Sequence, residues 1–276
     1  MTKSLAELAS AVPRGRILPV GPSRRRSVHV IERNALAYRR MWYVFLTGFF
    51  EPLLYLLSIG VGVGALVGRL PGPGGRLVTY EAFVAPGLLA AAAMNGSVFD
   101  TTFNFFVKYK YAGTYDAMLA TPLGVGDVAQ GEVGWALLRG TVYAAAFLLT
   151  MAALGLVASP WGVLAVPAAV LIGYGFAGLG LAATTWMRSF VDFDFVNLAL
   201  VPLFLFSATF FPLSRYPNGV AWVIRLTPLY QGVNLERSLV LGDVRWTLLV
   251  PAVYLGALGW GGVRVASARL ARLLQP

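Results

Sequence analysis

The sequence predicts an all-α integral membrane protein with six transmembrane helices. Two properties of the composition support this: 58% of the 276 residues are hydrophobic and only 12% are charged, whereas a soluble domain carries roughly 25% charged residues. A third is the pattern, in which long apolar runs are separated by short polar stretches. The chain has no cysteine, which excludes disulfides and cysteine-ligated metals.

The first part of the chain is basic. Residues 1–26 contain Lys3, Arg14, Arg16 and the run Arg24–Arg26, without the apolar core of a signal peptide. We expect a flexible, uncleaved tail lying on an anionic membrane leaflet. The net charge of +10 is concentrated in Arg residues beside apolar runs, so the lipid bilayer, rather than nucleic acid, is the expected partner.

The next stretch, Ser27–Trp42, is predicted to be an interfacial helix lying flat before the first span. Its apolar residues fall on one side at helical spacing: Val28, Ile31, Ala35, Tyr38 and Trp42. The predicted membrane domain covers residues 27–268, and residues 269–276 form a short cytoplasmic C-terminal tail.

Each of the six predicted spans reaches or approaches the ~20 residues that a helix needs to cross a bilayer. The spans are Met41–Val67, Glu81–Phe106, Glu132–Val157, Pro160–Met187, Phe193–Phe211 and Trp246–Ala266. Most Lys and Arg residues outside the spans fall on one side when the N-terminus is cytoplasmic. The positive-inside rule therefore predicts a plasma-membrane protein with both termini in the cytoplasm.

A polar stretch, Val107–Gln130, separates the second and third spans on the cytoplasmic side. Tyr111, Tyr115, Met118 and Leu119 fall on one face of a helix. Thr114 is a suitable N-cap, Asp116 suits the positive end of the helix dipole, and Pro122 ends the helix near Thr121. The pattern fits either a lever held by a soluble partner or an ordinary loop helix on the lipid surface.

The last external segment, Pro212–Arg245, is interrupted by three prolines yet rich in apolar residues. A free loop would be more polar. We expect two short helices that enter the outer leaflet or pack against the spans, because irregular backbone at that depth must be covered by protein.

Three ionisable residues are predicted to lie within spans: Glu51, Asp100 and Arg139. A charge at that depth costs several kcal/mol unless it is paired or hydrated. One hypothesis is that Arg139 pairs with Glu51 or Asp100. The alternative is that Arg139 reaches the headgroups while Glu51 lies beside a water-filled vestibule.

No phosphate-binding loop is present. That motif requires Gly directly before its Lys, and Lys3, Lys108 and Lys110 follow Thr, Val and Tyr. The chain is therefore not expected to be an enzyme or to hold a cofactor. Gly60, Gly64 and Gly68 form G-x-x-x-G steps inside an apolar run, a pattern that permits close helix packing.

The chain resembles the permease subunits of type-2 ABC exporters, in the branch of the NodJ and daunorubicin-resistance permeases. The resemblance rests on EPLLYLLSIGVGVGALVG (51–68), YEAFVAPGLLAAAAM (80–94), YDAMLATPLGVGDVAQGEV (115–133), FLFSATFFPLSRYP (204–217) and TPLYQGVNLER (227–237). It covers nearly the whole chain after residue 27.

The resemblance implies a permease that works with a separately encoded ATP-binding subunit, which holds ATP and Mg, and with a second permease, identical or paralogous. The helix 111–121 would be the coupling helix, contacting the ATPase through Tyr111, Tyr115, Asp116, Met118 and Leu119. The segment 212–241 would be the outer gate, with Phe211, Trp222, Ile224 and Tyr230 as its gate residues. The cargo implied is an amphiphilic drug, a lipid-linked glycan or a lipo-oligosaccharide.

Two other functions are consistent with the residues alone. A proton-coupled secondary transporter would use Glu51, Asp100 and Arg139. A non-transporting membrane scaffold would need no gate and no path between subunits.

Overall fold

The computed structural model describes residues 24–39 and 43–274, with side chains left out at 24–25, 43–49, 51–52 and 61. The described part is almost entirely helical. In chain order the main helices are α2 (Arg24–Arg39), α3 (Tyr43–Val67), α4 (Tyr80–Phe99), α5 (Phe105–Lys110), α6 (Thr114–Leu119), α7 (Val125–Ala153), α8 (Ala165–Thr184), α9 (Asp192–Leu205), α10 (Asn218–Leu226), α11 (Pro228–Leu241) and α12 (Leu249–Leu274). The predicted basic tail falls largely outside the described residues.

Short elements connect the helices. A π-helical turn, η2 (Asp100–Asn104), joins α4 to α5, and the short 3-10 helices η1 (Pro73–Gly75), η3 (Pro160–Leu164), η4 (Leu213–Arg215) and η5 (Trp246–Leu248) lie in the connections. Strands β1 (Arg69–Pro71) and β2 (Leu77–Thr79) form an antiparallel hairpin in which Leu70 pairs with Val78.

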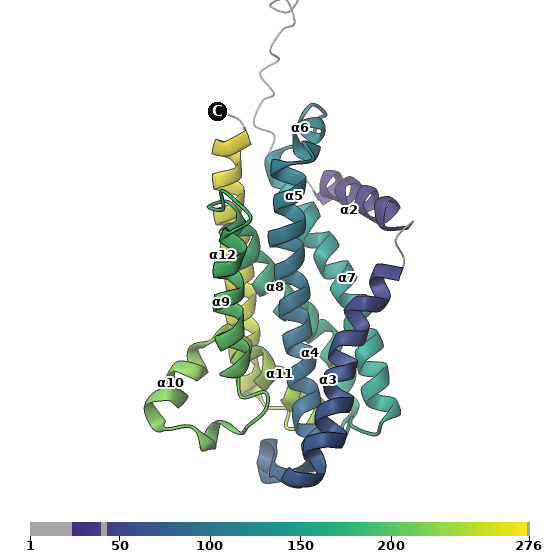
Figure 1. Ribbon diagram of the computed structural model, residues 1–276, viewed down its shortest axis with the longest axis vertical. Coiled ribbons are helices and arrows are strands. Elements are labelled where there is room, and N and C mark those ends of the chain that lie inside the picture. Colours follow the sequence, from purple (N-terminus) through teal and green to yellow (C-terminus); the bar gives the residue numbers. More distant parts are fainter. Residues whose placement is uncertain (1–23, 40–42, 275–276) are drawn as a thin grey trace, which may run out of the picture.

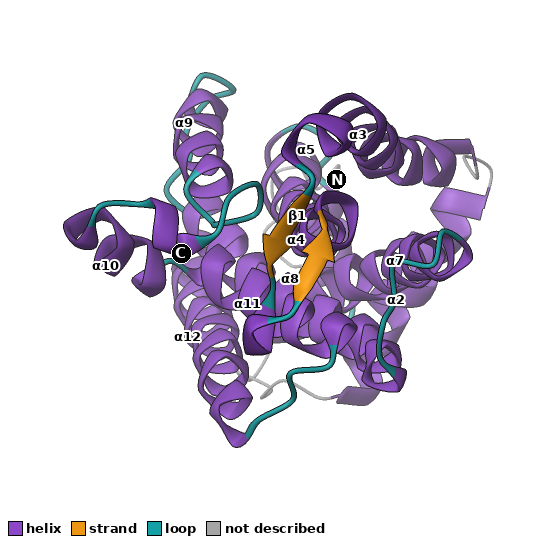
Figure 2. Ribbon diagram, turned by 90° about the horizontal axis from the view of Figure 1, so that it is seen from below, coloured by secondary structure: helices purple, strands orange, loops and turns teal. Residues whose placement is uncertain are grey.

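The two ends of the bundle are built differently. Figure 1 shows α2, α6 and the end of α12 together at one end, and Figure 2 looks onto the β1–β2 hairpin at the other. We refer to these as the α6 end and the hairpin end. The segment that connects α4 to α7 therefore lies at the same end of the bundle as the start of α2 and the end of α12. The predicted topology requires this arrangement.

Within the described residues, four helical stretches are long and apolar enough to cross a membrane: Tyr80–Lys110, Val125–Ala153, Pro160–Thr184 and Trp246–Leu274. They match the predicted second, third, fourth and sixth spans. The predicted fifth span is shorter than expected, because α9 ends at Leu205 after 14 residues. For the first span, the apolar helix is counted only over Leu53–Val67, so the six-span count remains a prediction.

Glycine allows the central helices to approach closely. A Cβ added at Gly178 of α8 would overlap the backbone of Gly259 in α12, and one at Gly262 would overlap the backbone of Gly178. Cβ atoms at Gly60 and Gly64 of α3 would meet the Glu81 side chain of α4. Membrane helices pack through such small residues because lipid provides no hydrophobic drive between them.

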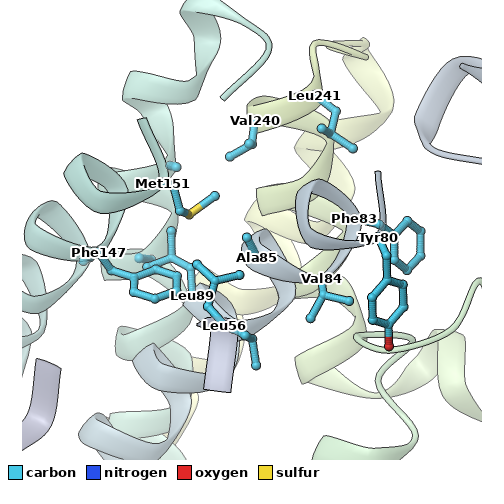
Figure 3. Packing of buried hydrophobic residues seen from close by; sticks show 14 residues of the cluster. Leu56, Tyr80, Phe83, Val84, Ala85, Leu89, Phe147, Met151, Val240 and Leu241 are labelled. Carbon is cyan, nitrogen blue, oxygen red and sulfur yellow. The ribbon is translucent and has the colours of Figure 1, made fainter. Parts of the chain in front are cut away.

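A buried apolar cluster closes the hairpin end, and Figure 3 shows its side chains interlocking. Phe83 and Val84 come from α4, Phe147 and Met151 from α7, and Val240 from α11. The second helix of the predicted external segment is therefore part of the core. Helix α10, in contrast, buries only Ile224.

Helix α2 lies across α7 and packs one of its faces against α7. Ser27, Val30 and Asn34 are buried, whereas Val28 is exposed. The reason is local: Gly131 of α7 leaves room for Val30, where a Cβ would collide with it. The predicted C-terminal tail is also revised, because α12 continues to Leu274 and buries Leu270.

Candidate functional site

A cavity of about 580 Å³ lies beside the bundle. Helices α3, α4, α7 and α9 and the π-helical turn η2 form its walls. Much of the lining is apolar, with Leu88, Leu89, Phe147 and Phe204 among its residues. The polar lining residues are Tyr55, Asn95, Ser97, Asp100, Thr102, Arg139, Tyr143 and Asn197.

Two charged residues of this lining form an ion pair. Arg139 Nη2 lies 2.5 Å from Asp100 Oδ1, and both side chains are almost completely buried. Asn104 also donates to Asp100 Oδ1, at 2.6 Å. The Arg139 guanidinium lies near the rings of Tyr38 and Tyr143, 5.6 and 5.8 Å from their centroids. Of the two partners that the sequence left open for Arg139, the structure shows Asp100.

The π-helical turn explains how Asp100 is aimed. Asp100, Thr101 and Thr102 are buried in η2. The hydroxyls of Thr101 and Thr102 donate hydrogen bonds to the carbonyl oxygens of Ser97 and Val98, respectively. Single π-turns inside long helices are frequently found at functional sites. Glu51, the other candidate partner, belongs to α3, but its side chain lies outside the described residues.

A second buried charge network lies at the α6 end. Lys108 Nζ is 2.7 Å from Glu132 Oε2 and donates to Asn34 Oδ1 at 3.2 Å. Asn34 Nδ2 donates to the same Glu132 oxygen at 3.2 Å. The network joins α2, α5 and α7, so these three helices are linked as one block. Sequence reasoning missed it, although Lys108 and Glu132 stand at facing ends of neighbouring spans.

Helix α6 runs from Thr114 to Leu119 and ends before Pro122, as predicted. The predicted cap is corrected: the N-cap is Gly113 in the left-handed conformation at φ 58°, and Thr114 is the first helical residue. A residue with a side chain rarely adopts that conformation, so Gly113 takes the place of a side-chain cap.

The predicted contact face of α6 is also corrected. Tyr115 is 1% exposed and Met118 7% exposed, packed in one cluster with Phe105 and Val128. Tyr115 lies 4.7 Å from the Phe105 ring. These two side chains therefore hold α6 onto the bundle in this chain. Tyr111, Asp116 and part of Leu119 remain at the surface.

Tyr115 is close to the second network. Its hydroxyl and Glu132 Oε1 are buried without a hydrogen-bond partner among the described residues. Burial, and then the neighbouring Glu132 carboxylate, raise the pKa of Tyr115 well above its ordinary value. Tyr115 is therefore a neutral phenol and adds no charge to the contact between α6 and α7.

The predicted gate residues at the hairpin end do not form one cluster. Phe211 and Trp222 are exposed, Ile224 is buried at the base of α10, and Tyr230 is half-buried in α11. The polar anchor of this region is Arg237, which the sequence did not single out. Arg237 donates to the carbonyl oxygens of Phe83, Ala208 and Thr209.

The described residues contain no cluster of His, Asp or Glu that could hold a metal ion. The site offers an amphiphilic cavity with an internally neutralised charge pair, and a rigid block of α2, α5 and α7 at one end. Such an arrangement can bind a molecule and transmit movement.

Comparison with known proteins gives a consistent picture. The family model described as ABC-2 type transporter matches residues 27–264. Nodulation protein J of Rhizobium leguminosarum bv. trifolii is 33% identical over 217 residues, covering 78% of this chain and 81% of that protein. Nodulation protein J of Rhizobium meliloti (strain 1021) is 30% identical over 233 residues, covering 84% and 86%.

Proposed function

Because this chain belongs to the ABC-2 type transporter family and is thus a membrane subunit of an ABC exporter, we propose that it exports a neutral, hydroxyl-rich amphiphile. A lipo-oligosaccharide or a lipid-linked glycan fits that description. The chain supplies the path, and a separately encoded ATP-binding subunit supplies the energy from ATP and Mg.

The chemistry of the cavity supports this cargo. Among the lining residues whose side chains the structure describes, Asp100 and Arg139 are the charged ones, and they neutralise each other. A cationic drug would need an unpaired carboxylate in the cavity, because a buried charge is costly without a partner. Sugar hydroxyls and amides match Asn95, Asn197 and Tyr143, while an acyl chain matches the Leu and Phe lining.

The ATP-binding subunit is proposed to bind at the α6 end, which we take as cytoplasmic. The exposed residues Tyr111 and Asp116 and the partly exposed Leu119 would form the contact. The network of Asn34, Lys108 and Glu132 would carry the movement to α2 and α7. The distribution of Lys and Arg in the sequence supports this orientation.

A second permease, identical or paralogous, is proposed to complete the cavity on the side of α3 and α9. Large apolar side chains are exposed on both helices, including Leu54 and Leu57 of α3 and Phe195 and Leu198 of α9. Exposed apolar area of this kind is typical of a face covered by lipid or by another subunit.

The test is uptake of a labelled lipo-oligosaccharide into inverted membrane vesicles that contain the permease and its ATP-binding partner. Uptake should require ATP and a hydrolysis-competent partner, and Asn197→Leu should reduce it while Arg225→Gln, on the exposed face of α10, should not. Uptake that persists without the partner and collapses with the proton gradient would instead support a secondary transporter.

A further inference from the structure

Helix α9 forms one wall of the cavity but is barely packed into the bundle. Its lining residues are Phe193, Val196, Asn197, Leu200, Val201 and Phe204. None of its 14 residues is buried, and Figure 2 shows it standing to one side of the other helices. Within this chain, α9 contacts the core through side chains that stay partly exposed, among them Val196, Leu200 and Phe204, so its position depends strongly on the contacts at its two ends.

The end of α9 at the hairpin side is fixed by a buried break in the helix. Ser207, Ala208 and Thr209 are almost completely buried. Arg237 Nη2 donates to the carbonyl oxygens of Ala208 and Thr209 at 2.9 and 3.2 Å. Its Nε donates to Phe83 O at 3.0 Å, and its guanidinium lies 3.8 Å from the centre of the Phe83 ring. Arg237 is part of α11, so its hydrogen bonds connect the break after α9 to both α11 and α4.

The backbone of this break is unusual. Ala208 has φ 57°, the one positive φ among the described residues other than glycine. Such a conformation persists only when its surroundings impose it. Gly87 of α4 contributes, since a Cβ there would lie 2.8 Å from Thr209 Cγ2. The break is therefore held from two sides, by Arg237 and by the surface of α4.

The opposite end of α9 contacts a group of aromatic rings, of which Phe106 is buried and Tyr111, Phe103 and Phe190 are exposed. Phe190 stacks on Tyr111, with centroids 5.0 Å apart and planes at 18°. Phe193 lies 5.3 Å from Phe106 and 5.5 Å from Phe103. The Asp192 carboxylate accepts from the backbone N–H groups of Arg188 and Ser189 at 2.6 and 3.1 Å, which starts the helix.

Tyr111 connects this end of α9 to the coupling segment. It directly follows α5 and lies three residues before α6, and its side chain is 63% exposed. A displacement of α6 would be passed to Phe190 through the stacked rings. The rings can slide, whereas the hydrogen bonds of a buried guanidinium are costly to break.

We propose that α9 is a lever whose end at Phe190 is driven by Tyr111 and whose other end is held by Arg237, so that movement of the coupling segment tilts one wall of the cavity. This proposal rests on the proposed function, because it requires the ATP-binding subunit to act at the α6 end. Arg237 and Phe190 are positioning residues in it, and neither needs to touch the cargo.

The test is a pair of distances in the complete transporter with its ATP-binding subunit. The chain has no native cysteine, so spin labels can be placed at introduced cysteines without background. One pair joins position 195 of α9 to position 179 of α8, and the other joins position 205 to position 163. Labelled chains are diluted with unlabelled ones so that distances within one protomer are read. In the unmodified background, trapping the nucleotide-bound state should shift the first distance and leave the second unchanged.

Matched variants separate the two ends. Phe190→Ala should abolish the nucleotide-dependent shift of the first distance, and Phe190→Tyr, which keeps a ring, should retain it. Arg237→Gln should make the second distance vary with nucleotide. Gly87→Ala, which displaces Thr209 without touching Arg237, should do the same and serves if Arg237→Gln does not fold.

Each outcome has a distinct meaning. If the ATP-binding subunit does not associate or its hydrolysis is unaffected by the permease, the proposed function fails. If hydrolysis is coupled but both distances shift equally, or neither shifts, the lever is wrong and the proposed function stands. A shift that survives Phe190→Ala overturns the driven end.

Discussion

Removing Arg139 should destabilise the protein more than removing both members of its ion pair. The two side chains are 8% and 5% exposed and their charged atoms lie 2.5 Å apart. Arg139→Met would leave the Asp100 carboxylate without its cation, although the Asn104 amide would still donate to it. Breaking a buried pair from one side costs about 3–5 kcal/mol. We expect the lower part of that range, because the pair borders a cavity that water can enter.

The double variant Asp100→Asn with Arg139→Met leaves no uncompensated charge, so its cost should fall to about 1 kcal/mol, the value of a lost hydrogen bond. The difference between single and double variants is thus about 2 kcal/mol or more. Reversible unfolding in mixed detergent micelles would measure it, with Arg188→Met as a control at an exposed charge. If Arg139→Met is as stable as the double variant, the pair is not the buried contact that this reasoning requires.

Three further predictions concern the packing and the α6 end. Lys108→Met should cost about 3 kcal/mol by leaving Glu132 buried without its cation, and adding Glu132→Gln should recover most of it in the same unfolding assay; an unchanged double variant would contradict the network. Gly178→Ala should cost about 1–3 kcal/mol through overpacking against Gly259, whereas Gly261→Ala, with nothing within 4 Å of its Cβ, should be neutral, and equal effects would refute the close approach of α8 and α12. Hydrogen bonds from the N–H groups of Arg188 and Ser189 hold the pKa of Asp192 below its usual value. The stabilisation is therefore present above the ordinary carboxyl pKa of about 3.9 and is lost as pH falls through the lowered pKa. Amide hydrogen exchange at residues 188–194 should accordingly rise only in acid, and Asp192→Asn should remove that pH dependence.

Much of the fold follows from the apolar runs, because burial in lipid demands helices of a fixed minimum length. The spans α4, α7, α8 and α12 were predicted on that basis. The length rule does not anticipate where a helix breaks inside an apolar run. The sequence from Phe206 to Phe211 is as apolar as α9 itself, yet the chain leaves the helix there and Ala208 takes a positive φ.

The candidate site shows where helical periodicity stops being sufficient. The spacing of Tyr111, Tyr115 and Met118 predicts one face, but α6 is too short to include Tyr111, and Gly113 separates them. An apolar face on a helix outside the membrane also has two possible partners, another protein or its own bundle. Here Tyr115 and Met118 face their own bundle, a choice that depends on Phe105 and Val128 from distant segments.

Pairing of Arg139 with Asp100 was one of the hypotheses that the charges within the spans suggested, whereas the buried pair of Lys108 and Glu132 was missed. The contacts of Arg237 with backbone acceptors were missed as well. Arg237 binds three carbonyl oxygens, two of which are free only because the helix breaks at Ala208. A backbone acceptor leaves no mark in the sequence, since every residue carries one.

The central claim is that this permease is moved from the cytoplasm by a nucleotide-driven subunit bound at α6. Site-specific cross-linking in the purified complex tests it most directly, with cysteines placed singly at positions 115, 116, 118 and 119. We expect cross-links to the ATP-binding subunit from positions 116 and 119 and none from 115 and 118. Cross-links from the hairpin end, or none from α6 in a complex that still couples ATP hydrolysis to export, would contradict it.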